Sequence, residues 1–198
     1  MATPLLGAEG LHLEYPTRVV FDSVSLGIEE GDRIGLVGRN GDGKSSLLGM
    51  LAGTREPDSG RVTRRGGVRV GVLTQTDLFD DEDTVGHAVV GDTPEHVWAG
   101  DPKVRDILAG LLTDLPWDAR LGELSGGERL RAFLAAALFA RPLPQLLVLD
   151  EPTNNLDISG VEQLAGALAE WKGALLLVTH DAGFAGQVGI EREVPIRA

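Results

Sequence analysis

The feature that most constrains the fold is a glycine-rich loop, GRNGDGKSSL at residues 38–47, which separates an apolar run from a helix-like stretch. Gly38, Gly43, Lys44 and Ser45 follow the spacing G-x-x-x-x-G-K-[ST], with RIGLVG before the loop and SSLLGML after it. Glycines let the backbone curl so that successive N–H groups point at one anion, and the following helix directs its positive end at the same anion. The pattern therefore predicts a phosphate-binding loop between a strand and a helix. The alternative is a flexible turn that carries a surface lysine.

The residue types in this loop indicate how a nucleotide would be held. Lys44 would reach the β- and γ-phosphates, and the Ser45 hydroxyl would ligate Mg²⁺. The other loop residues would surround the phosphates with backbone N–H groups. The residues predicted to contact the phosphates are Gly38, Arg39, Asn40, Gly41, Asp42, Gly43, Lys44, Ser45 and Ser46.

Two further apolar runs have the pattern of parallel strands buried on both faces, QLLVLD at 145–150 and ALLLVTH at 174–180. Helical patterns at 44–53, 126–140 and 159–171 separate the strands. The last of these helices has Ser159 as its predicted N-cap. Because ligands of open α/β sheets bind beyond the carboxyl ends of the strands, we expect the functional residues there.

Polar residues follow both of these strands. Asp150 would bind Mg²⁺ directly or through water, Glu151 would polarise the attacking water, and His180 would contact the γ-phosphate. The alternative is that two acidic residues merely terminate a strand and that the histidine is structural. The phosphate loop upstream favours the nucleotide site.

The remaining segments complete an α/β fold. EGLHLEY and VVFDSVSLGIEEGD near the N-terminus alternate as antiparallel strands do, and KVRDILAGLL lies helix-like within a mixed region. We therefore predict a single domain over 1–198 with a P-loop NTPase core, a mostly parallel sheet and an N-terminal antiparallel β element. The core would comprise 1–84 and 123–198, and a small helical subdomain would comprise about 85–122.

A second helix begins with an anion-binding pattern, LSGGERLR at 124–131. Ser125 and the amides of Gly126 and Gly127 would form this second site. The alternative is an N-cap serine followed by two loop glycines. Two phosphate-binding helix starts in one small domain are explained if the second serves the nucleotide of another copy.

Taken in order, these motifs resemble the nucleotide-binding domain of the ATP-binding cassette (ABC) superfamily over nearly the whole chain. The resemblance implies that Tyr15, 29 positions before Lys44, stacks on adenine. It implies that Gln75 links Mg²⁺ and water to the helical subdomain, and that Asp157 reaches a partner subunit. In this family two domains pack head to tail, so each copy would complete the ATP site of the other. The residues that would do so are Ser125, Gly126, Gly127 and Glu128.

DEPTNNLD together with LSGGER is similar to the ABC-F proteins, which lack membrane domains and mostly act on ribosomes. Transporter ATPases more often have SALD and a glutamine after LSGG, so a transporter subunit remains an alternative. ABC-F proteins usually carry two such domains and a charged linker, whereas this chain has one domain, and 49 residues separate Gln75 from Ser125. Residues up to about 120 resemble a first tandem domain and the later ones a second. A truncated or hybrid cassette is therefore expected, and one without turnover is a further alternative.

Charge and composition limit the partners. The chain has 18 basic and 30 acidic side chains, and the segment 76–101 has eight acidic residues and no lysine or arginine. That segment disfavours contact with nucleic acid or anionic lipid. No apolar run approaches the roughly 20 residues that cross a bilayer, and the N-terminus lacks a signal-peptide pattern. With no cysteines either, we expect a cytoplasmic protein without direct membrane insertion.

Overall fold

The computed structural model describes residues 4–39, 41–73, 80–94, 98–100, 102–139, 144–154 and 156–196. The chain divides into two compact units. Unit 1 comprises Met1–Thr74, Gln145–Pro152 and Lys172–Ala198, and unit 2 comprises Gln75–Pro144 and Thr153–Trp171. Two predicted site residues, Asn40 and Gln75, lie outside the described residues.

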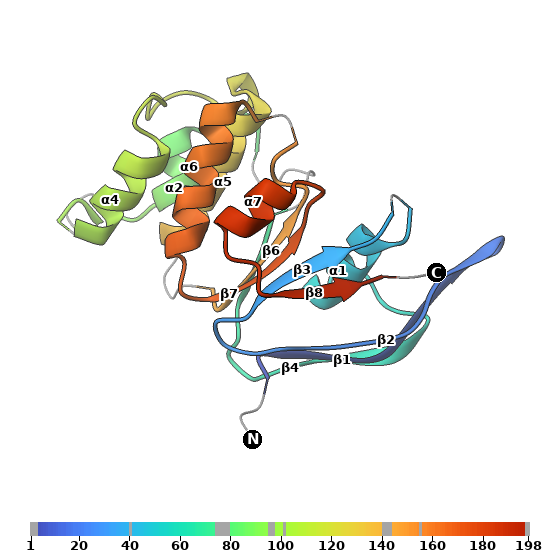
Figure 1. The fold of residues 1–198 in the computed structure, drawn as a ribbon. Coiled ribbons are helices and arrows are strands. Elements are labelled where there is room, and N and C mark those ends of the chain that lie inside the picture. The colour runs from blue at the N-terminus through green and yellow to red at the C-terminus, as the bar shows by residue number, and fades with distance from the viewer. Residues whose placement is uncertain are drawn as a thin grey trace. The chain divides into compact units, whose positions relative to one another are not determined.

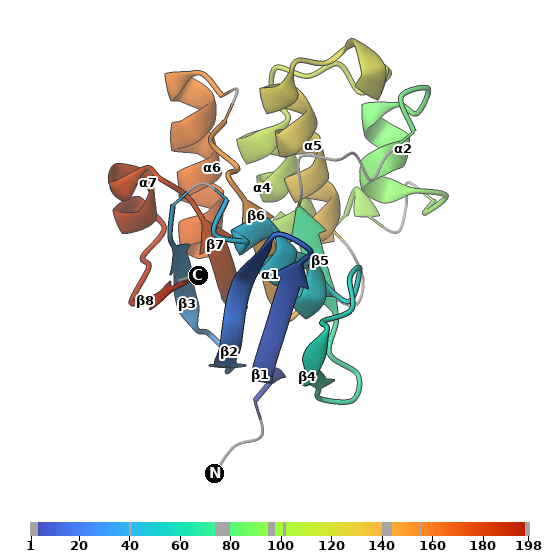
Figure 2. The same ribbon diagram turned by 90° about the vertical axis from the view of Figure 1, so that its right-hand side faces the viewer.

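Unit 1 contains a parallel sheet with the strand order β5-β6-β7-β3-β8 (Figure 1; β5 is labelled in Figure 2). Its strands are β3 (Arg33–Val37), β5 (Val70–Leu73), β6 (Leu146–Asp150), β7 (Ala174–Val178) and β8 (Arg192–Pro195). Every residue of β7 is buried, as expected for an aliphatic strand covered on both faces. The parallel strands predicted from the three apolar runs are confirmed. The edge strand β8 was not predicted, because REVP is short and polar.

A second sheet in unit 1 is antiparallel, with the strand order β2-β1-β4. It consists of β1 (Leu6–Tyr15), β2 (Arg18–Ile28) and β4 (Ser59–Arg64). Strand β1 buries Leu6, Ala8, Leu11 and Leu13, whereas residues between them are more exposed. This confirms the predicted antiparallel element. The turn after β1 places Tyr15 opposite Arg18.

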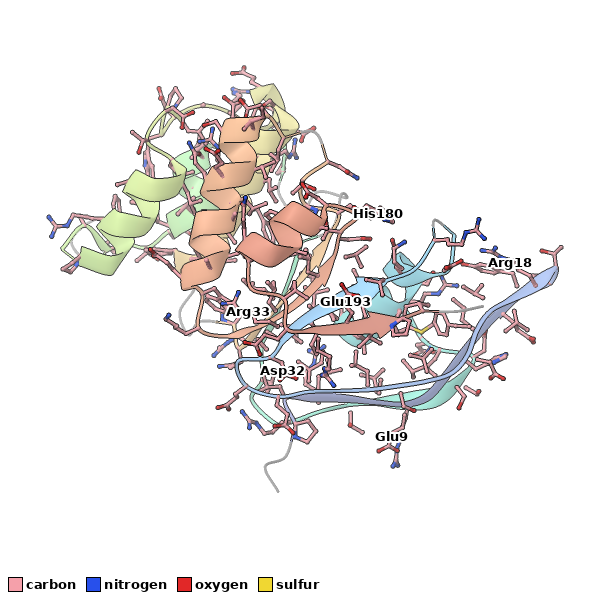
Figure 3. The ribbon with its side chains drawn as sticks, in the orientation of Figure 1. Glu9, Arg18, Asp32, Arg33, His180 and Glu193 are labelled. Atoms are coloured by element: carbon pink, nitrogen blue, oxygen red, sulfur yellow. The ribbon has the colours of Figure 1, made fainter. Side chains whose placement is uncertain are left out.

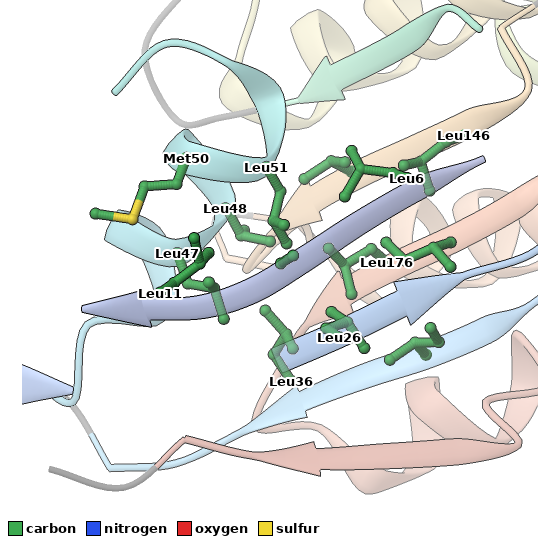
Figure 4. Close-up of a cluster of buried hydrophobic side chains, with 14 of the residues drawn as sticks. Leu6, Leu11, Leu26, Leu36, Leu47, Leu48, Met50, Leu51, Leu146 and Leu176 are labelled. Carbon is green, nitrogen blue, oxygen red and sulfur yellow. The ribbon is translucent and has the colours of Figure 1, made fainter. Parts of the chain in front are cut away.

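Helix α1 (Lys44–Ala52) lies between the two sheets of unit 1 (Figure 2). Figure 4 shows its apolar side chains between residues of the antiparallel and the parallel sheet. The buried apolar side chains of the helix are Leu47, Leu48, Met50 and Leu51. A helix that is apolar around most of its circumference is buried on several sides, and this packing fixes the position of the glycine loop that precedes it. Helix α7 (Ala182–Gln187) follows β7 in the same unit.

Unit 2 is helical in its described part. It contains α2 (Val85–Val90), α4 (Pro102–Leu111), a 3-10 turn η1 (Leu121–Glu123), α5 (Gly126–Phe139) and α6 (Ile158–Glu170). Helix α5 packs against α2, α4 and α6. The predicted helical subdomain spanned 85–122, whereas unit 2 also includes α5 and α6. None of the described helices has the length and apolar character needed to cross a membrane.

The start of α6 differs from the prediction. The N-cap is Asp157, whose Oδ1 accepts the backbone N–H of Gly160 at 2.8 Å. Ser159 lies within the first turn instead, so the predicted Ser159 cap is wrong. A carboxylate at this position satisfies an otherwise unpaired N–H and faces the positive end of the helix.

Candidate functional site

The glycine loop joins β3 to α1, and its backbone has the curl that phosphate binding requires. Gly41 and Gly43 have φ of +89° and +87°, in the left-handed region that residues with a side chain rarely adopt. Arg39 and Asp42 close a turn, because the Arg39 N–H donates to Asp42 Oδ2 at 2.6 Å and the Asp42 N–H donates to the Arg39 carbonyl at 3.1 Å. Helix α1 begins directly afterwards and adds N–H groups that have no partner within the helix.

The two curled glycines have different surroundings. A Cβ at Gly43 would lie 3.0 Å from Phe21 Cδ1 and closer still to Val20 Cγ1, so strand β2 excludes a side chain there. At Gly41 the nearest atoms would be the guanidinium nitrogens of Arg18, at 3.7 and 3.9 Å. Arg18 Nη2 also donates to the Gly41 carbonyl at 2.5 Å (Figure 3 labels Arg18). Sequence reasoning missed Arg18, because no motif links it to a loop 23 residues away.

Lys44 supplies a buried cation to this loop. Its residue is 7% exposed, and its Nζ donates to the carbonyl oxygens of Gly38 at 2.8 Å and Arg39 at 3.1 Å. These hydrogen bonds offset part of the cost of burying an ammonium group. They also hold the positive charge at the loop, where an anion bound by the backbone N–H groups would meet it. Ser45 and Ser46 follow in the first turn of α1, and Ser45 is exposed.

The other predicted strand ends lie on the same edge of the sheet as the loop. Strand β7 lies between β6 and β3, and the three run parallel. Neighbouring strands are roughly 5 Å apart, so the residues that follow them are close along this edge. Asp150 ends β6 opposite Val178, the last residue of β7. The fold of unit 1 therefore gathers Asp150, Glu151, His180 and the glycine loop on one sheet edge.

Glu151 and His180 are in direct contact. Glu151 Oε1 lies 2.9 Å from His180 Nε2, and the Glu151 side chain is 16% exposed (Figure 3 labels His180). Glu151 has a φ of +48°, and its N–H donates to the Val178 carbonyl at 2.9 Å. A left-handed conformation of a non-glycine residue is strained, and residues held in this way cluster at functional sites. The contact orients the carboxylate that the sequence predicts to be catalytic.

Tyr15 is connected to the loop through a residue that sequence reasoning missed. Arg55 Nη1 donates to Tyr15 Oη at 3.1 Å and to Ser46 Oγ at 3.3 Å. Its guanidinium carbon lies 5.5 Å from the centroid of the Tyr15 ring. No short motif marks Arg55, since it lies 40 residues from Tyr15. The structure therefore links the predicted adenine contact to the predicted phosphate loop.

The signature segment, Leu124–Glu128, forms a capping box at the start of α5 in unit 2. Glu128 Oε2 accepts the backbone N–H and the hydroxyl of Ser125, both at 2.7 Å. These hydrogen bonds hold the pKa of Glu128 below its ordinary range. Both the predicted anion site and its alternative, an N-cap serine, are compatible with this geometry.

A pocket of about 310 Å³ in unit 2 brings the signature segment together with Asp157. It is lined by Asp114, Ser125, Gly127, Glu128, Arg131, Asp157, Ser159, Gly160 and Gln163. Arg131 is 6% exposed, pairs through both terminal nitrogens with Asp114 at 2.6 and 3.0 Å, and donates to Gln163 Oε1 at 2.8 Å. These contacts connect α5 to α6 and to the segment after α4. The N-terminal ends of α5 and α6 therefore line the same pocket, and this polar network connects the two helices.

The donors predicted for Mg²⁺ fit a shared site. Among the described residues, no group of three or more His, Cys, Asp or Glu side chains could hold a metal ion. Mg²⁺ is commonly bound by one or two protein groups together with phosphate oxygens and water. Ser45 and Asp150 are oxygen donors on the same sheet edge, so they suit an ion that arrives with a nucleotide.

Comparison with known sequences places these features in a wider group. The profile of the family described as ABC transporter matches residues 21–154. The chain is 38% identical to the probable ATP-binding protein YheS of Escherichia coli, over 91% of this chain and 28% of YheS. It is 36% identical to the tylosin resistance ATP-binding protein TlrC of Streptomyces fradiae, over 90% of this chain and 40% of TlrC. It is 33% identical to the energy-dependent translational throttle protein EttA of Escherichia coli, over 93% of this chain and 33% of EttA.

The chain thus spans about a third of the length of these curated relatives. Among solved structures, the ATP-binding subunit of an ABC transporter superposes with a TM-score of 0.79 at 20% identity, covering 98% of this chain and 88% of that one. An ATP-binding cassette of another ABC transporter superposes with a TM-score of 0.77 at 22% identity, covering 99% and 88%. At this level of identity the likeness concerns the fold.

Proposed function

The chain belongs to the ABC transporter family of ATP-binding cassettes, and on this premise we propose that it is an ABC-F-like domain that binds and hydrolyses Mg²⁺-ATP. The phosphates would lie on residues 38–46 and the adenine against Tyr15. One observation carries the proposal above all. The curled loop with its buried Lys44 shares a sheet edge with the contacting pair Glu151 and His180.

The chemistry assigned to the chain is positioning and electrostatic stabilisation. Lys44 and the loop N–H groups would hold the β- and γ-phosphates. Mg²⁺, held by Ser45 and Asp150, would neutralise charge on those phosphates when bound. Glu151, oriented by His180, would accept a hydrogen bond from water and align the water with the γ-phosphate.

A second copy, or a second cassette, would complete the site. The pocket shared by Ser125, Gly127 and Asp157 belongs to unit 2, and its α5 N-terminus suits an anion. We propose that it receives the γ-phosphate of ATP bound to the partner, in a head-to-tail pair. Asp157 would also contact the partner, although one of its oxygens caps α6.

Glu151→Gln tests the hydrolytic role. The amide keeps the size of the side chain but is a much weaker base, so phosphate release should fall by about a hundredfold or more. ATP should then hold the variant as a dimer, and light scattering would detect it as a doubling of the 21.0 kDa chain mass. Adding Lys44→Ala should abolish nucleotide binding. The matched control for Glu151→Gln is Glu193→Gln, which makes the same change at an exposed glutamate. Hydrolysis by Glu151→Gln at the unmutated rate would refute the assignment.

Mixing two inactive variants tests the pairing. Lys44→Ala removes the loop cation and keeps the signature segment, whereas Gly127→Asp adds a negative charge to the pocket and keeps the loop. Each variant alone should be inactive. In a mixture, one composite site contains an intact loop and an intact signature segment, so part of the ATPase activity should return. No recovery, with each variant still folded by circular dichroism, would contradict the head-to-tail arrangement.

The ribosome is the partner we propose for the full-length context. The names of two relatives refer to translation and to resistance against tylosin, and this is the support for the proposal. Sedimentation with ribosomes and, separately, with membrane vesicles would test it in the presence of ATP and with Glu151→Gln. Co-sedimentation with membranes alone would favour a transporter subunit instead.

A further inference from the structure

The strand that contains Tyr15 restricts the Tyr15 side chain little. It is the last residue of β1, at the turn into β2, and it is 42% exposed. An exposed aromatic side chain at a turn loses rotamer freedom when a ligand stacks on it, and this loss weakens binding. A neighbouring group that restricts the ring beforehand would reduce that cost.

Arg55 is such a group. One of its nitrogens donates both to Tyr15 Oη, at 3.1 Å, and to Ser46 Oγ, at 3.3 Å, while its guanidinium carbon lies 5.5 Å from the ring centroid. The hydrogen bond from Arg55 is the largest cause that lowers the pKa of Tyr15 below its ordinary value of 10.0, and a hydrogen bond with Ser46 is the next largest. Two kinds of contact, a hydrogen bond and a cation–π contact, therefore act on the same ring.

The position of Arg55 is itself set by α1. The helix ends at Ala52, and the backbone N–H of Arg55 donates to the Gly49 carbonyl at 3.2 Å. The Thr54 N–H donates to the same carbonyl at 2.9 Å. Because the other end of α1 starts at the phosphate loop, the guanidinium is anchored to the element that would hold the phosphates.

We propose that Arg55 is a positioning residue that orients the Tyr15 ring for stacking on the nucleobase and thereby sets the affinity for the base of ATP. The inference rests on the proposed function, since it requires ATP on residues 38–46 and its base at Tyr15. A competing explanation is that Arg55 simply adds positive charge near the triphosphate. The two explanations differ in one respect: positioning strengthens binding of ATP but not of inorganic tripolyphosphate, whereas charge strengthens both.

The experiment compares ATP and tripolyphosphate binding by calorimetry, with Mg²⁺, for the unmodified chain, Arg55→Met, Tyr15→Ala and the double variant. Arg55→Met should weaken ATP binding about three- to tenfold and leave tripolyphosphate binding unchanged. In the Tyr15→Ala background, Arg55→Met should have no further effect on ATP. Tyr15→Phe, which keeps the ring and loses the hydroxyl, should lose about two- to threefold. Arg61→Met, at an exposed arginine of the same unit, is the charge-matched control.

Several results would overturn the inference. Equal losses of affinity for ATP and for tripolyphosphate would show that Arg55 acts through its charge. A full effect of Arg55→Met in the absence of the tyrosine ring would show that Arg55 does not act through Tyr15. Unchanged ATP binding by Arg55→Met would remove its role altogether. If Tyr15→Ala binds ATP normally while tripolyphosphate still competes, the inference fails and the phosphate loop stands. If the unmodified chain binds neither ligand, the proposed function itself is refuted.

Discussion

Substituting alanine at two glycines of one loop separates backbone strain from steric exclusion. Gly41 and Gly43 have nearly the same φ, +89° and +87°, so alanine is strained at both. Their surroundings differ, because a Cβ at Gly43 would collide with Val20 and Phe21, whereas a Cβ at Gly41 would meet only guanidinium nitrogens at 3.7 Å or more. Gly43→Ala should therefore destabilise the chain much more than Gly41→Ala.

The expected magnitudes follow from these terms. A left-handed conformation costs an alanine about 1–2 kcal/mol. The loss of freedom in the unfolded chain offsets about 0.4–1 kcal/mol of this cost. Gly41→Ala should thus lose about 0–1.6 kcal/mol. A methyl group forced into a packed site adds about 1–3 kcal/mol, so Gly43→Ala should lose about 1–3 kcal/mol more than Gly41→Ala.

Urea unfolding without nucleotide, followed by far-ultraviolet circular dichroism, measures both losses. The midpoint should shift while the slope stays constant, which indicates a change of stability rather than of compactness. Hydrogen exchange of the β2 and α1 amides should be fastest in Gly43→Ala, because the collision lies between these elements. Equal loss of stability in the two variants would refute the reasoning, since strain alone would then explain both.

Two predictions concern unit 2, which contains all three tryptophans, so tryptophan fluorescence reports its unfolding. Arg131→Met removes a buried guanidinium from its polar network and should cost about 2 kcal/mol, less than the loss of a fully buried pair because the Asp114 side chain is 61% exposed and can rehydrate. The exposed Arg61→Met should cost less than about 0.5 kcal/mol, and equal costs would contradict the burial argument. For pH, hydrogen bonds from Ser125 lower the pKa of Glu128 in the folded chain. The contribution of Glu128 to the free energy of unfolding is complete above the pKa of the unfolded chain and is lost as the pH falls through the lower pKa of the folded chain. Urea midpoints should therefore decline below about pH 4.5, and less steeply in Glu128→Gln.

The sequence was most informative where the residues of one short segment determine the structure of that segment. The spacing of Gly38, Gly43 and Lys44 predicts a strand, a curled loop and a helix, because each backbone conformation is favoured by its own residue. Continuous aliphatic runs predict buried parallel strands for the same reason, and the structure has them. Even local chemistry left ambiguity, since Ser159 and Asp157 are both good N-caps and the structure uses Asp157.

Tertiary structure alone decided which residues meet. Glu151 and His180 come from two strands whose ends become neighbours only when the sheet takes its observed order. Arg55 reaches Tyr15 across 40 residues, and β2 makes Gly43 sterically necessary from more than 20 residues away. None of these residues is unusual in its own segment. Their contacts depend on strand register and on the packing of α1 between two sheets, which are collective properties of the folded chain and have no counterpart in any short stretch of sequence.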